Sequence, residues 1–514
     1  MGASYSVRND PLPVYQTGVT LLDPNRWQPL LFKEAVTQNG LPADVIQTFL
    51  GDNWGIVRPF ALDSLNGSDL HIDPGQPPQW GGASEAAYKA GNLDVIRFSS
   101  LLDPNQSEAI DISPSAYGNS TLGTNEGSGR ATNPFTMQAY PPNEVLHADL
   151  GRVLAEFWAD GPDSETPPGH WNKLANDVVD HPEFEARFTG SGAMIDPLQW
   201  DVFMYFALNG ALHDAAVVAW GCKRVYDYIR PISSIRYLCA LGQSSDPAGP
   251  AYHAGGIPLE DDLVEVITAE SAASGERHAH LSEHIGEIAI YAWRGEAAGL
   301  QSGVAGVGWI LGEAWMPYQN ATFVNPAFAG YVSGHSTFSR AAAEVMTQLT
   351  GSEFFPGGLA SFTAEQDAYL KFETGPSTDV TLQWATYYDA ADQAGLSRLY
   401  GGIHVPADDG PGRIMGAHCG ERAWAEAIKY LDGSIHDEPS QARISTNQAG
   451  EIMLEWDGIR GFHYRIHRSG NLTGFTPDPS WFRAGETDEQ AIVEENIDAG
   501  PGAQFYIIER EENP

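Results

Sequence analysis

The chain has 514 residues, enough to bury a large hydrophobic core, and its 67 acidic residues against 28 basic ones give a formal net charge of -39. Such an acidic surface repels phosphate backbones and anionic lipid headgroups, which argues against nucleic acid and membrane partners. Hydrophobic residues make up 42% of the sequence and aromatic residues 11%, so the composition excludes a disordered chain and indicates a globular protein.

The first part of the chain is predicted to be mostly helical. Residues 1–140 are rich in Gly, Pro, Asn and Asp, and we expect loops with short elements there. Helical periodicity is clear from Asn143, in NEVLHADLGRVLAEFWAD, and then in the apolar stretch Leu198–Ile229. That stretch contains Asp214 and Lys223, so it is interpreted as a buried core helix or helix pair and not as a membrane span. Further helices are predicted at Asp261–Ala272, His278–Arg294, Val304–Tyr318, His335–Leu349, Leu382–Leu399 and Gly412–Leu431. These elements predict a mostly α fold, a helical-bundle core with long connections.

The character of the sequence changes after Asp432, where GSIHDEPSQ has the composition of a linker. Residues 440–514 contain alternating runs such as FHYRIHRSG and AQFYIIERE, with turn signals at Asp-Gly and Ser-Gly. The sequence therefore predicts a helical domain at 1–432 and a small β-sandwich-like domain at 440–514. The second resembles the fibronectin-like modules that end many bacterial exported proteins. It is expected to act either as a stabilising appendage or in attachment, oligomer contacts or sugar binding.

Three short stretches, far apart in the sequence, carry most of the chemistry: KRVYDYIRP at 223–231, SGH at 333–335 and SRLYGGIHVPAD at 397–408. Their cations are Lys223, Arg230 and Arg398, which would compensate about three negative charges, with Arg giving forked hydrogen bonds and Lys a point charge. An α-helix places Lys223 and Arg230 on nearly the same face, two turns apart. Pro231 disfavours helix at Arg230, so this side chain is expected at a helix end, directed into a cleft.

The second and third stretches add donors and histidines. Ser333 and Gly334 precede a predicted helix, whose N-terminus offers free N–H groups to an anion, and Gly334 allows close backbone approach. His335 at that helix start is suited to general acid or base chemistry. His404 is suited to act as a nucleophile or as a metal ligand, and Asp408 to accept its other ring N–H. The whole set suits a multiply charged tetrahedral or trigonal-bipyramidal oxyanion held against a histidine.

This set resembles the vanadium-dependent haloperoxidases and their relatives, the type 2 phosphatidic acid phosphatase superfamily. The family pattern is Lys, six residues, Arg-Pro; then Ser-Gly-His; then Ser-Arg, five residues, His, three residues, Asp. Two further stretches look like bacterial haloperoxidases in particular: FWADGPDSETPPGHWN at 157–172 and LHDAAVVAWGCK at 212–223. The similarity covers roughly residues 20–430 and implies a helical-bundle haloperoxidase core with vanadate as cofactor.

The resemblance also implies a role for each residue. His404 would coordinate the vanadium, His335 would be the acid–base residue, and Asp408 would support His404 in competition with its neighbour Asp409. The residues that would hold the vanadate oxygens are Lys223, Arg230, Ser333, Gly334 through its backbone N–H, and Arg398.

The implied activity is the oxidation of halide by hydrogen peroxide to hypohalous acid, which halogenates small organic acceptors. Vanadium would act as a Lewis acid without redox cycling. An acid phosphatase that uses the same site with His404 as nucleophile is the nearest alternative. Val332 stands where phosphatases usually carry Pro before Ser-Gly-His, which favours a haloperoxidase. Phe328, seven residues before His335, matches chloroperoxidases but leaves the halide open. A non-catalytic adhesion or scaffold protein, centred on the C-terminal module, is a third reading.

The remaining signals concern cysteines, other metals and location. Cys222, Cys239 and Cys419 form no disulfide framework, and the first two either pair or stay reduced and buried. His280 and His284 have metal-ligand spacing but lack an obvious carboxylate or Cys partner.

The start MGASYSVRND lacks an apolar core, so no signal peptide is visible. Vanadium(V) survives better outside a reducing cytosol, which favours a periplasmic or secreted protein, and a homo-oligomer is compatible with the sequence.

Overall fold

The computed structural model describes residues 5–14, 16–36, 42–63, 65, 69–118, 129–159, 164–295, 303–320 and 323–437, together with the C-terminal strands and residue 470. The chain divides into two compact units, Met1–Ile428 and Lys429–Pro514. Each unit is described by itself.

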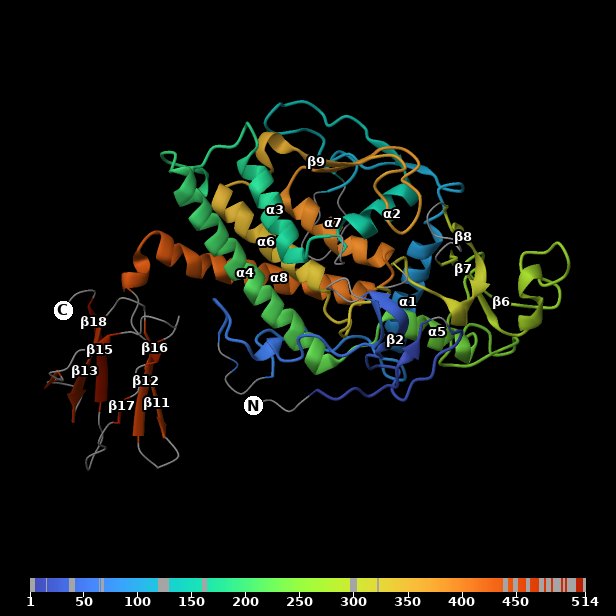
Figure 1. Ribbon diagram of the computed structural model, residues 1–514, viewed down its shortest axis with the longest axis horizontal. Coiled ribbons are helices and arrows are strands. Elements are labelled where there is room, and N and C mark those ends of the chain that lie inside the picture. Colours follow the sequence, from blue (N-terminus) through green and yellow to red (C-terminus); the bar gives the residue numbers. More distant parts are fainter. Residues whose placement is uncertain are drawn as a thin grey trace. The chain divides into compact units, whose positions relative to one another are not determined.

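A bundle of long helices forms the centre of the first unit (Figure 1). Its members are α4 (Pro197–Tyr226), α6 (Gly334–Thr350), α7 (Tyr387–Tyr400) and α8 (Pro406–Leu431). Helix α6 packs against both α4 and α7. The mostly α, helical-bundle fold that the sequence predicts is confirmed.

Local sequence signals explain where these helices begin and end. The Asp196 side chain accepts a hydrogen bond from the Leu198 N–H at the start of α4, and Asp227 ends that helix in the left-handed conformation. Ser333 caps α6 by accepting from the Ser336 N–H, and Thr386 with Asp389 forms a capping box on α7. The caps place the three predicted functional stretches at helix ends.

Helix α4 is long and apolar enough by composition to cross a membrane. Within its most apolar window, 61% is buried inside the fold, and Asp214 near its middle accepts hydrogen bonds from the Phe60 and Ala61 N–H groups. The prediction of a buried core helix at Leu198–Ile229 therefore agrees with the structure, as one helix and not a pair.

Glycines on one face of α8 allow it to lie directly against α6. A Cβ atom at Gly416 would overlap the carbonyl oxygen of Thr337, and one at Gly420 would lie 2.6 Å from that of Ala341. Since real Cβ atoms do not approach so closely, both positions require glycine at this helix spacing. The contact brings the N-termini of α6 and α8 together: the Ser333 N–H donates to the Asp408 carbonyl at 2.9 Å.

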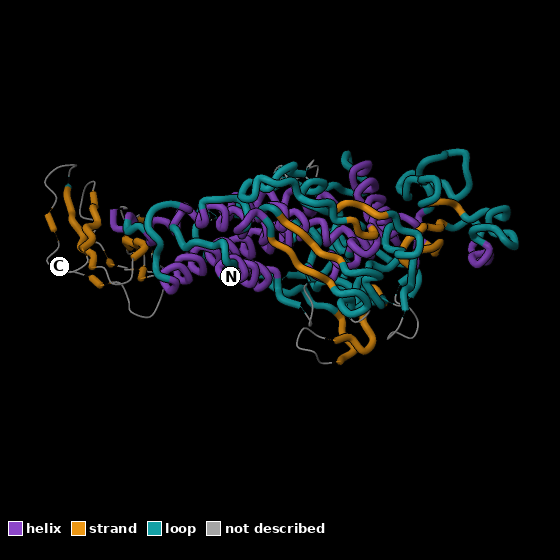
Figure 2. Tube along the Cα trace, turned by 90° about the horizontal axis from the view of Figure 1, so that it is seen from above, coloured by secondary structure: helices purple, strands orange, loops and turns teal. Residues whose placement is uncertain are grey.

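Short sheets and further helices surround the bundle, and loops run over it when it is seen from above (Figure 2). The other helices of the described part are α1 (Glu85–Ser100), α2 (His147–Phe157), α3 (Pro167–Val179) and α5 (Pro231–Leu241), with short 3-10 turns at Trp54–Ile56, Phe188–Gly190, Ala279–His284, Gly312–Ala314, Pro356–Gly358 and Ser434–Asp437. The strands of this unit pair as β1 (Leu12–Pro13), β2 (Leu30–Val36) and β3 (Pro42–Ile46); β4 (Ala109–Asp111) and β5 (Glu144–Leu146); β6 (Val264–Val266), β7 (Ile288–Trp293) and β8 (Val307–Leu311); β9 (Ala360–Ala364) and β10 (Val380–Trp384).

Three predicted helices are wrong. The segments Asp261–Ala272, His278–Arg294 and Val304–Tyr318 contain the antiparallel strands β6, β7 and β8. Most of β7 is buried on both faces, so its sequence IAIYAW lacks the polar alternation that marks a half-buried strand. Flanking residues such as Glu, Ala and His then mimic helical periodicity.

The N-terminal prediction also needs correction, because residues 1–140 include the four-turn helix α1. The predicted helix Leu382–Leu399 is divided, with β10 ending at Trp384 and α7 beginning at Tyr387. Helices α3 and α5 follow Pro-containing starts and were not predicted, although Pro is favoured in the first turn.

Within its described residues, the second unit contains two four-stranded sheets. One consists of β11 (Ala442–Thr446), β12 (Ile452–Gly458), β16 (Ala491–Ile492) and β17 (Glu495–Asn496). The other consists of β13 (His463–Ser469), β14 (Thr476–Pro477), β15 (Phe482–Arg483) and β18 (Phe505–Glu511). The strand-like runs seen in the sequence are strands, while the proposed boundaries at 432 and 440 remain a prediction.

The α6–α8 contact leads to a prediction about stability. Replacing Gly416 with Ala forces the two helices apart, and the free energy of unfolding should fall by about 1–3 kcal/mol. The matched control is Gly221→Ala in α4, where the nearest atom, on Leu70, lies 3.4 Å from the added Cβ. That control should be neutral or stabilising, because Ala favours helix over Gly. Urea unfolding measures both; equal effects would contradict the packing argument.

Candidate active site

The eight residues singled out by the sequence occupy neighbouring helix ends. They are Lys223 in the last turn of α4, Arg230 before α5, Ser333, Gly334 and His335 at the start of α6, Arg398 in the last turn of α7, His404 in the α7–α8 connection and Asp408 in the first turn of α8. All eight are buried. Hydrogen bonds link all three stretches, so segments about 180 residues apart in sequence meet in one region.

Two of the cations bind backbone carbonyls around the start of α6. The Lys223 ammonium donates to the carbonyl oxygens of Ala329, Gly330 and Val332 at 3.0, 2.8 and 2.6 Å. The Arg230 guanidinium donates from Nε to Phe328 O at 3.0 Å and from Nη1 to the Ile403 carbonyl at 2.8 Å. These side chains were expected to face an oxyanion. In the structure they also fix the backbone leading to Ser333.

His404 is oriented by a carboxylate on one side and meets a cation on the other. Its Nδ1 lies 2.8 Å from Asp408 Oδ2, and its Nε2 lies 3.3 Å from Arg230 Nη1. Because an ionised carboxylate only accepts, Nδ1 carries the proton and Nε2 presents its lone pair. Asp409 does not compete for His404, since it accepts from Ser336 Oγ at 2.6 Å and pairs with Arg413 at 2.7 Å.

His335 and Arg398 share a backbone partner. Arg398 Nη1 donates to the Trp158 carbonyl at 2.8 Å, and the His335 ring hydrogen-bonds to the Trp158 backbone. His335 Nε2 is buried and has no hydrogen-bond partner among the described residues. A buried ring nitrogen without a partner is costly, so its position is suited to a ligand or a transferred proton.

The charges of the site do not balance. Three cationic side chains face one nearby carboxylate, Asp408, in a region closed to water. Burial lowers the pKa of Lys223, and the Arg230 charge lowers it further. Burial likewise lowers the pKa of Arg230 to about 9, and burial with neighbouring cations lowers the pKa of His404. Each of these pKa values is lowered because burying positive charge without a matching negative charge is unfavourable. A bound anion would supply negative charge and reduce that cost.

Burial has the opposite effect on Asp408: it raises the pKa of this carboxyl, while the charges of Lys223 and Arg230 counteract the rise and favour the ionised form. The pKa of His335 is lowered by burial first and by the Arg398 charge second. Its imidazole is therefore neutral at neutral pH and able to accept a proton.

Aromatic rings close the Lys223 side of the site. The ring centroid of Phe328 lies 5.1 Å from Lys223 Nζ and 5.3 Å from Arg230 Cζ. Trp220 packs against Phe328 with centroids 4.9 Å apart. These faces exclude water and attract the cations. Trp220 was not singled out from the sequence, although it lies one helical turn before Lys223.

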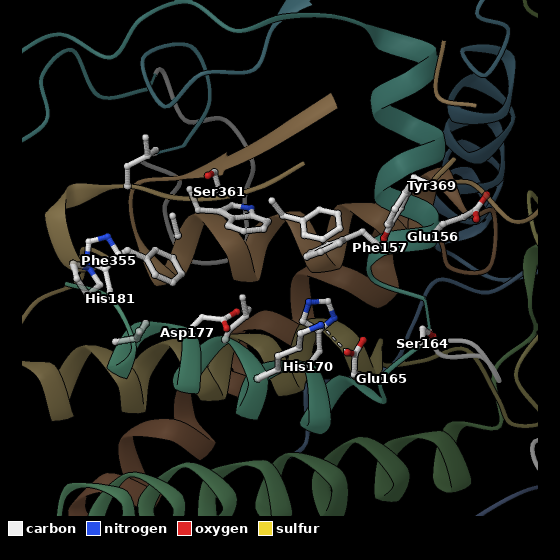
Figure 3. A pocket seen from close by; sticks show the side chains of 18 of the residues that line it. Glu156, Phe157, Ser164, Glu165, His170, Asp177, His181, Phe355, Ser361 and Tyr369 are labelled. Carbon is white, nitrogen blue, oxygen red and sulfur yellow. Dashed lines mark hydrogen bonds and ion pairs between the residues drawn. The ribbon is translucent and has the colours of Figure 1, made fainter. Parts of the chain in front are cut away.

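A cavity of about 560 Å³ lies between α3 and the β9–β10 hairpin (Figure 3). Trp158 links this cavity to the candidate site residues, since its carbonyl accepts from Arg398 and its ring stacks on His170 with centroids 4.4 Å apart. His170 lines the cavity, and its charge, if present, would lower the pKa of His335. In the sequence, His170 stands out only as part of the stretch 157–172 that resembles bacterial haloperoxidases. Nothing in its neighbours PPGHWN distinguishes it from a histidine of the core.

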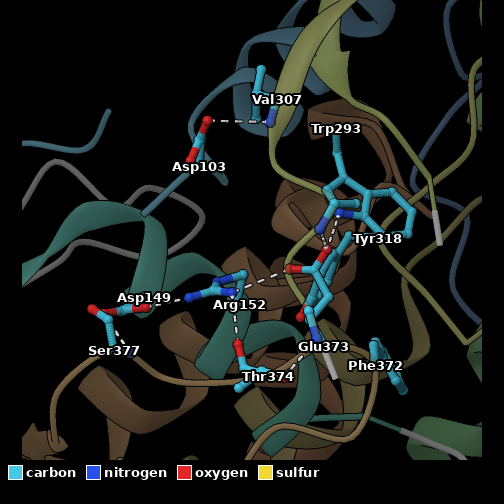
Figure 4. A network of polar contacts seen from close by, with 12 residues as sticks. Asp103, Asp149, Arg152, Trp293, Val307, Tyr318, Phe372, Glu373, Thr374 and Ser377 are labelled. Atoms are coloured by element: carbon cyan, nitrogen blue, oxygen red, sulfur yellow. Dashed lines mark hydrogen bonds and ion pairs between the residues drawn. The ribbon is translucent and has the colours of Figure 1, made fainter. Parts of the chain in front are cut away.

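A buried ionic network fixes the end of α2, which carries Glu156, Phe157 and Trp158 (Figure 4). Arg152 pairs with Asp149 and, at 3.2 Å, with Glu373, and all three side chains are fully buried. Glu373 also accepts from Trp293 Nε1 at 2.7 Å. Through these contacts the segment around Glu373 is held against α2.

The other sequence signals do not form a second metal site within the described residues, where no group of three potential metal ligands occurs. His280 Nε2 lies 2.8 Å from the Trp309 carbonyl, and His284 Nδ1 lies 3.1 Å from Glu287. These two histidines lie in a 3-10 turn and not on an α-helix. The three cysteines are free and buried, so Cys222 and Cys239 do not pair.

Comparisons with known proteins identify the fold. The sequence profile of the VCPO second helical-bundle domain matches residues 203–433, a segment that contains all eight site residues. The structure is similar to the apo form of a bacterial vanadium-dependent chloroperoxidase, with a TM-score of 0.52 and 16% identity over 84% of this chain and 66% of that one. The holo form of a bacterial vanadium-dependent chloroperoxidase gives a TM-score of 0.49 and 15% identity over 84% and 65%. No curated protein matches the sequence.

The chain spans slightly less than two thirds of the length of these chloroperoxidases. The expected resemblance is confirmed: the helical unit has the vanadium-haloperoxidase fold. Residues 203–433 match the model of that family's second helical-bundle domain.

The Arg152 network generates a stability prediction. Arg152→Met leaves two buried carboxylates without their cation, so the free energy of unfolding should fall by about 3–5 kcal/mol. Arg277→Met is the control, because Arg277 forms solvent-exposed pairs with Asp262 and Glu265, and it should change stability very little. Urea unfolding that gives the same small change for both variants would contradict a structural role for the network.

His170 generates a pH prediction. Burial lowers its pKa from 6.5 to about 4, so between these values the unfolded chain binds more protons than the folded one. Its contribution to stability is therefore lost as pH falls through this window, by about 2 kcal/mol between pH 7 and pH 5. His170→Phe keeps an aromatic ring and should lose correspondingly less stability on acidification. Chemical unfolding at both pH values measures this, and parallel losses in parent and variant would refute the assignment.

Proposed function

We propose that this protein is a vanadate-dependent haloperoxidase that uses hydrogen peroxide to oxidise halide to hypohalous acid. The observation that carries the proposal is the His404 environment: Nδ1 bound to Asp408, and Nε2 turned toward a cluster of buried cations. In balanced form, hydrogen peroxide, a halide ion and a proton give hypohalous acid and water. The halide loses two electrons and the peroxide gains them.

The residues present fit vanadate on chemical grounds. Vanadate is a compact oxyanion, and the site offers an excess of buried positive charge, the N-terminus of α6 and one imidazole nitrogen that carries no proton. We propose that His404 Nε2 is the metal ligand and that Asp408 fixes its tautomer. Oxygen-binding groups would be Lys223, Arg230, Ser333, the Gly334 N–H and Arg398. The N-terminus of α6 adds the partial positive charge that favours anions at such positions.

When bound, vanadate supplies a Lewis-acid centre that activates peroxide without a change in its own oxidation state. His335 handles the protons: its neutral Nε2 accepts one from hydrogen peroxide and returns it to the oxygen that leaves as water. The buried cations stabilise the negative charge that accumulates on peroxide oxygen as halide attacks. Phe328 and Trp220 keep water from the cationic side.

The phosphatase alternative would use the same cations with His404 as nucleophile. The profile match and the fold are those of haloperoxidases, so a phosphatase is not favoured. Hydrogen peroxide, halide and small organic acceptors are the proposed reaction partners. Assembly into a homo-oligomer remains part of the proposal without a structural contact behind it.

The test follows peroxide-dependent halogenation of a dione at increasing vanadate, with iodide, bromide and chloride in parallel. We expect His404→Ala to bind vanadate more than about 100-fold more weakly, because it loses the metal ligand itself. His335→Ala should retain vanadate affinity while turnover falls about 10²–10⁴-fold. His418→Ala, an exposed histidine on α8, is the control and should behave as the parent.

Two results would reject parts of this proposal. Vanadate affinity in His404→Ala equal to that of the parent would eliminate the ligand assignment. Turnover of an aryl phosphate, with no halide oxidised at saturating vanadate, would replace the haloperoxidase by the phosphatase.

A further inference from the structure

We infer that Arg413 is a positioning residue: by holding Asp409 between α6, α7 and α8, it fixes His335 and His404 relative to each other. This role rests on the proposed function for what the two histidines do. The affinity for vanadate measures it without halide or peroxide. Arg413 lies outside the three sequence stretches at 223–231, 333–335 and 397–408, so their pattern does not single it out.

Two pairs of consecutive residues connect the candidate active site to a further layer of polar contacts. His335 is followed in α6 by Ser336. Asp408, which orients His404, is followed in α8 by Asp409. The Ser336 hydroxyl donates to Asp409 Oδ1 at 2.6 Å. Each pair therefore places one residue in the site, while the second residue joins it to the other pair.

Arg413 lies one turn further along α8 and binds the Asp409 carboxylate with a fork of two hydrogen bonds. Its Nε donates to Asp409 Oδ1 at 2.9 Å, and its Nη2 donates to Asp409 Oδ2 at 2.7 Å. A contact at both oxygens fixes the plane of the carboxylate, which a single hydrogen bond would not do. The oxygen that accepts from Ser336 is therefore held in one position.

The same guanidinium also binds α7, the helix that ends with Arg398 in its last turn. Arg413 Nη1 lies 2.8 Å from Asp392 Oδ1, and Nη2 donates to the Asp392 carbonyl oxygen at 3.0 Å. Arg413, Asp392, Asp409 and Ser336 are all buried. Arg413 thus joins three helices of the bundle close to the ends that carry the site residues (Figure 1).

A glycine in α7 leaves room for this network. A Cβ atom at Gly395 would overlap Asp409 Oδ1 and would lie 3.0 Å from Arg413 Nη2. Gly395 lies inside the helix, where the backbone itself does not require glycine. The contact with the carboxylate and the guanidinium is therefore the physical reason for glycine at this position.

The charge of Arg413 is compensated, unlike the charges of Lys223 and Arg230. Burial disfavours the charged guanidinium, but Asp409 and Asp392 outweigh burial and raise the pKa of Arg413. A bound oxyanion is therefore not needed to offset this charge. The contribution of Arg413 to the site is the geometry that it gives to Asp409 and Ser336.

Arg413→Lys tests this role, because lysine keeps the positive charge but cannot form the fork. In isothermal titration calorimetry on the full chain, vanadate should bind at least about tenfold more weakly than to the parent. Turnover at saturating vanadate should fall as well, since His335 is displaced together with His404. Arg340→Lys is the matched control: Arg340 forms a buried pair with Glu344 at 3.0 Å within α6, and this variant should bind vanadate as the parent does.

Ser336→Ala removes the link between Asp409 and α6 without leaving a buried charge unpaired. It should weaken vanadate binding about tenfold, and it decides the question if circular dichroism shows that Arg413→Lys does not fold. Its control is Ser99→Ala in α1, where a buried hydroxyl accepts from the Trp293 N–H at 3.1 Å. In the Arg413→Lys background, Ser336→Ala should weaken binding by less than about twofold more, because both changes act through one carboxylate.

Urea unfolding of the same variants separates positioning from stability. If Arg413 only stabilises the fold, Arg413→Lys lowers the free energy of unfolding and leaves both vanadate affinity and turnover as in the parent. That result would overturn the inference. So would equal losses of affinity in the controls, additive losses in the double variant, or a parent that binds no vanadate.

The proposed function is judged separately, by oxidation of iodide to triiodide by the parent at saturating vanadate. Vanadate binding that weakens in Arg413→Lys and Ser336→Ala, without iodide oxidation by the parent, would keep the positioning role and reject the haloperoxidase. Iodide oxidation by the parent, with unchanged vanadate affinity and turnover in both variants, would do the reverse.

Discussion

The direct contact between α6 and α8 is the constraint on which the candidate active site depends. Gly416 and Gly420 remove the side chains that would hold the two helices apart, and the helix N-termini then meet at the Ser333–Asp408 hydrogen bond. One helix start carries His335 and the other carries the carboxylate that orients His404. Backbone atoms, and not flexible side chains, set the distance between the two helices. His335 and His404 therefore keep a fixed position relative to each other. This is the kind of rigid support that precise chemistry requires.

The second determinant is an imbalance of buried charge. Lys223 and Arg230 are largely occupied by the carbonyls of the segment before α6, so their donors stabilise the backbone while their charge remains at the site. Burying this charge lowers the cations' own pKa values and is a cost to the folded state. A bound oxyanion would offset this cost. The buried positive charge would then be concentrated at one site, in a protein that otherwise carries a large excess of acidic groups. The chain as a whole is strongly acidic, whereas these buried side chains are positively charged.

The sequence predicted which residues meet at the candidate site better than it predicted the elements around them. Charged and polar groups such as Lys223, Arg398 and His404 are costly to bury. Their spacing relative to Pro231 and to Ser-Gly-His therefore already limits, in the sequence alone, which chemistry the site can carry out. The sheet β6–β8 was mistaken for helices because a strand buried on both faces loses its polar alternation. The cavity at His170 was not predictable, since its walls come from α2, α3 and the β9–β10 hairpin. Only the folded chain brings Phe157 and Trp384 together.

Three consecutive residues at the end of α2 take part in three separate environments. Glu156 accepts the Lys371 N–H and the Tyr318 hydroxyl, Phe157 faces the cavity, and Trp158 holds Arg398 through its carbonyl. Because these residues are consecutive, a displacement of the segment around Glu373, which pairs with Arg152, would move the Phe157 ring and the Trp158 carbonyl together. A substitution at Glu373, which does not line the cavity, would therefore alter the shape of the cavity while all of its lining residues stay the same.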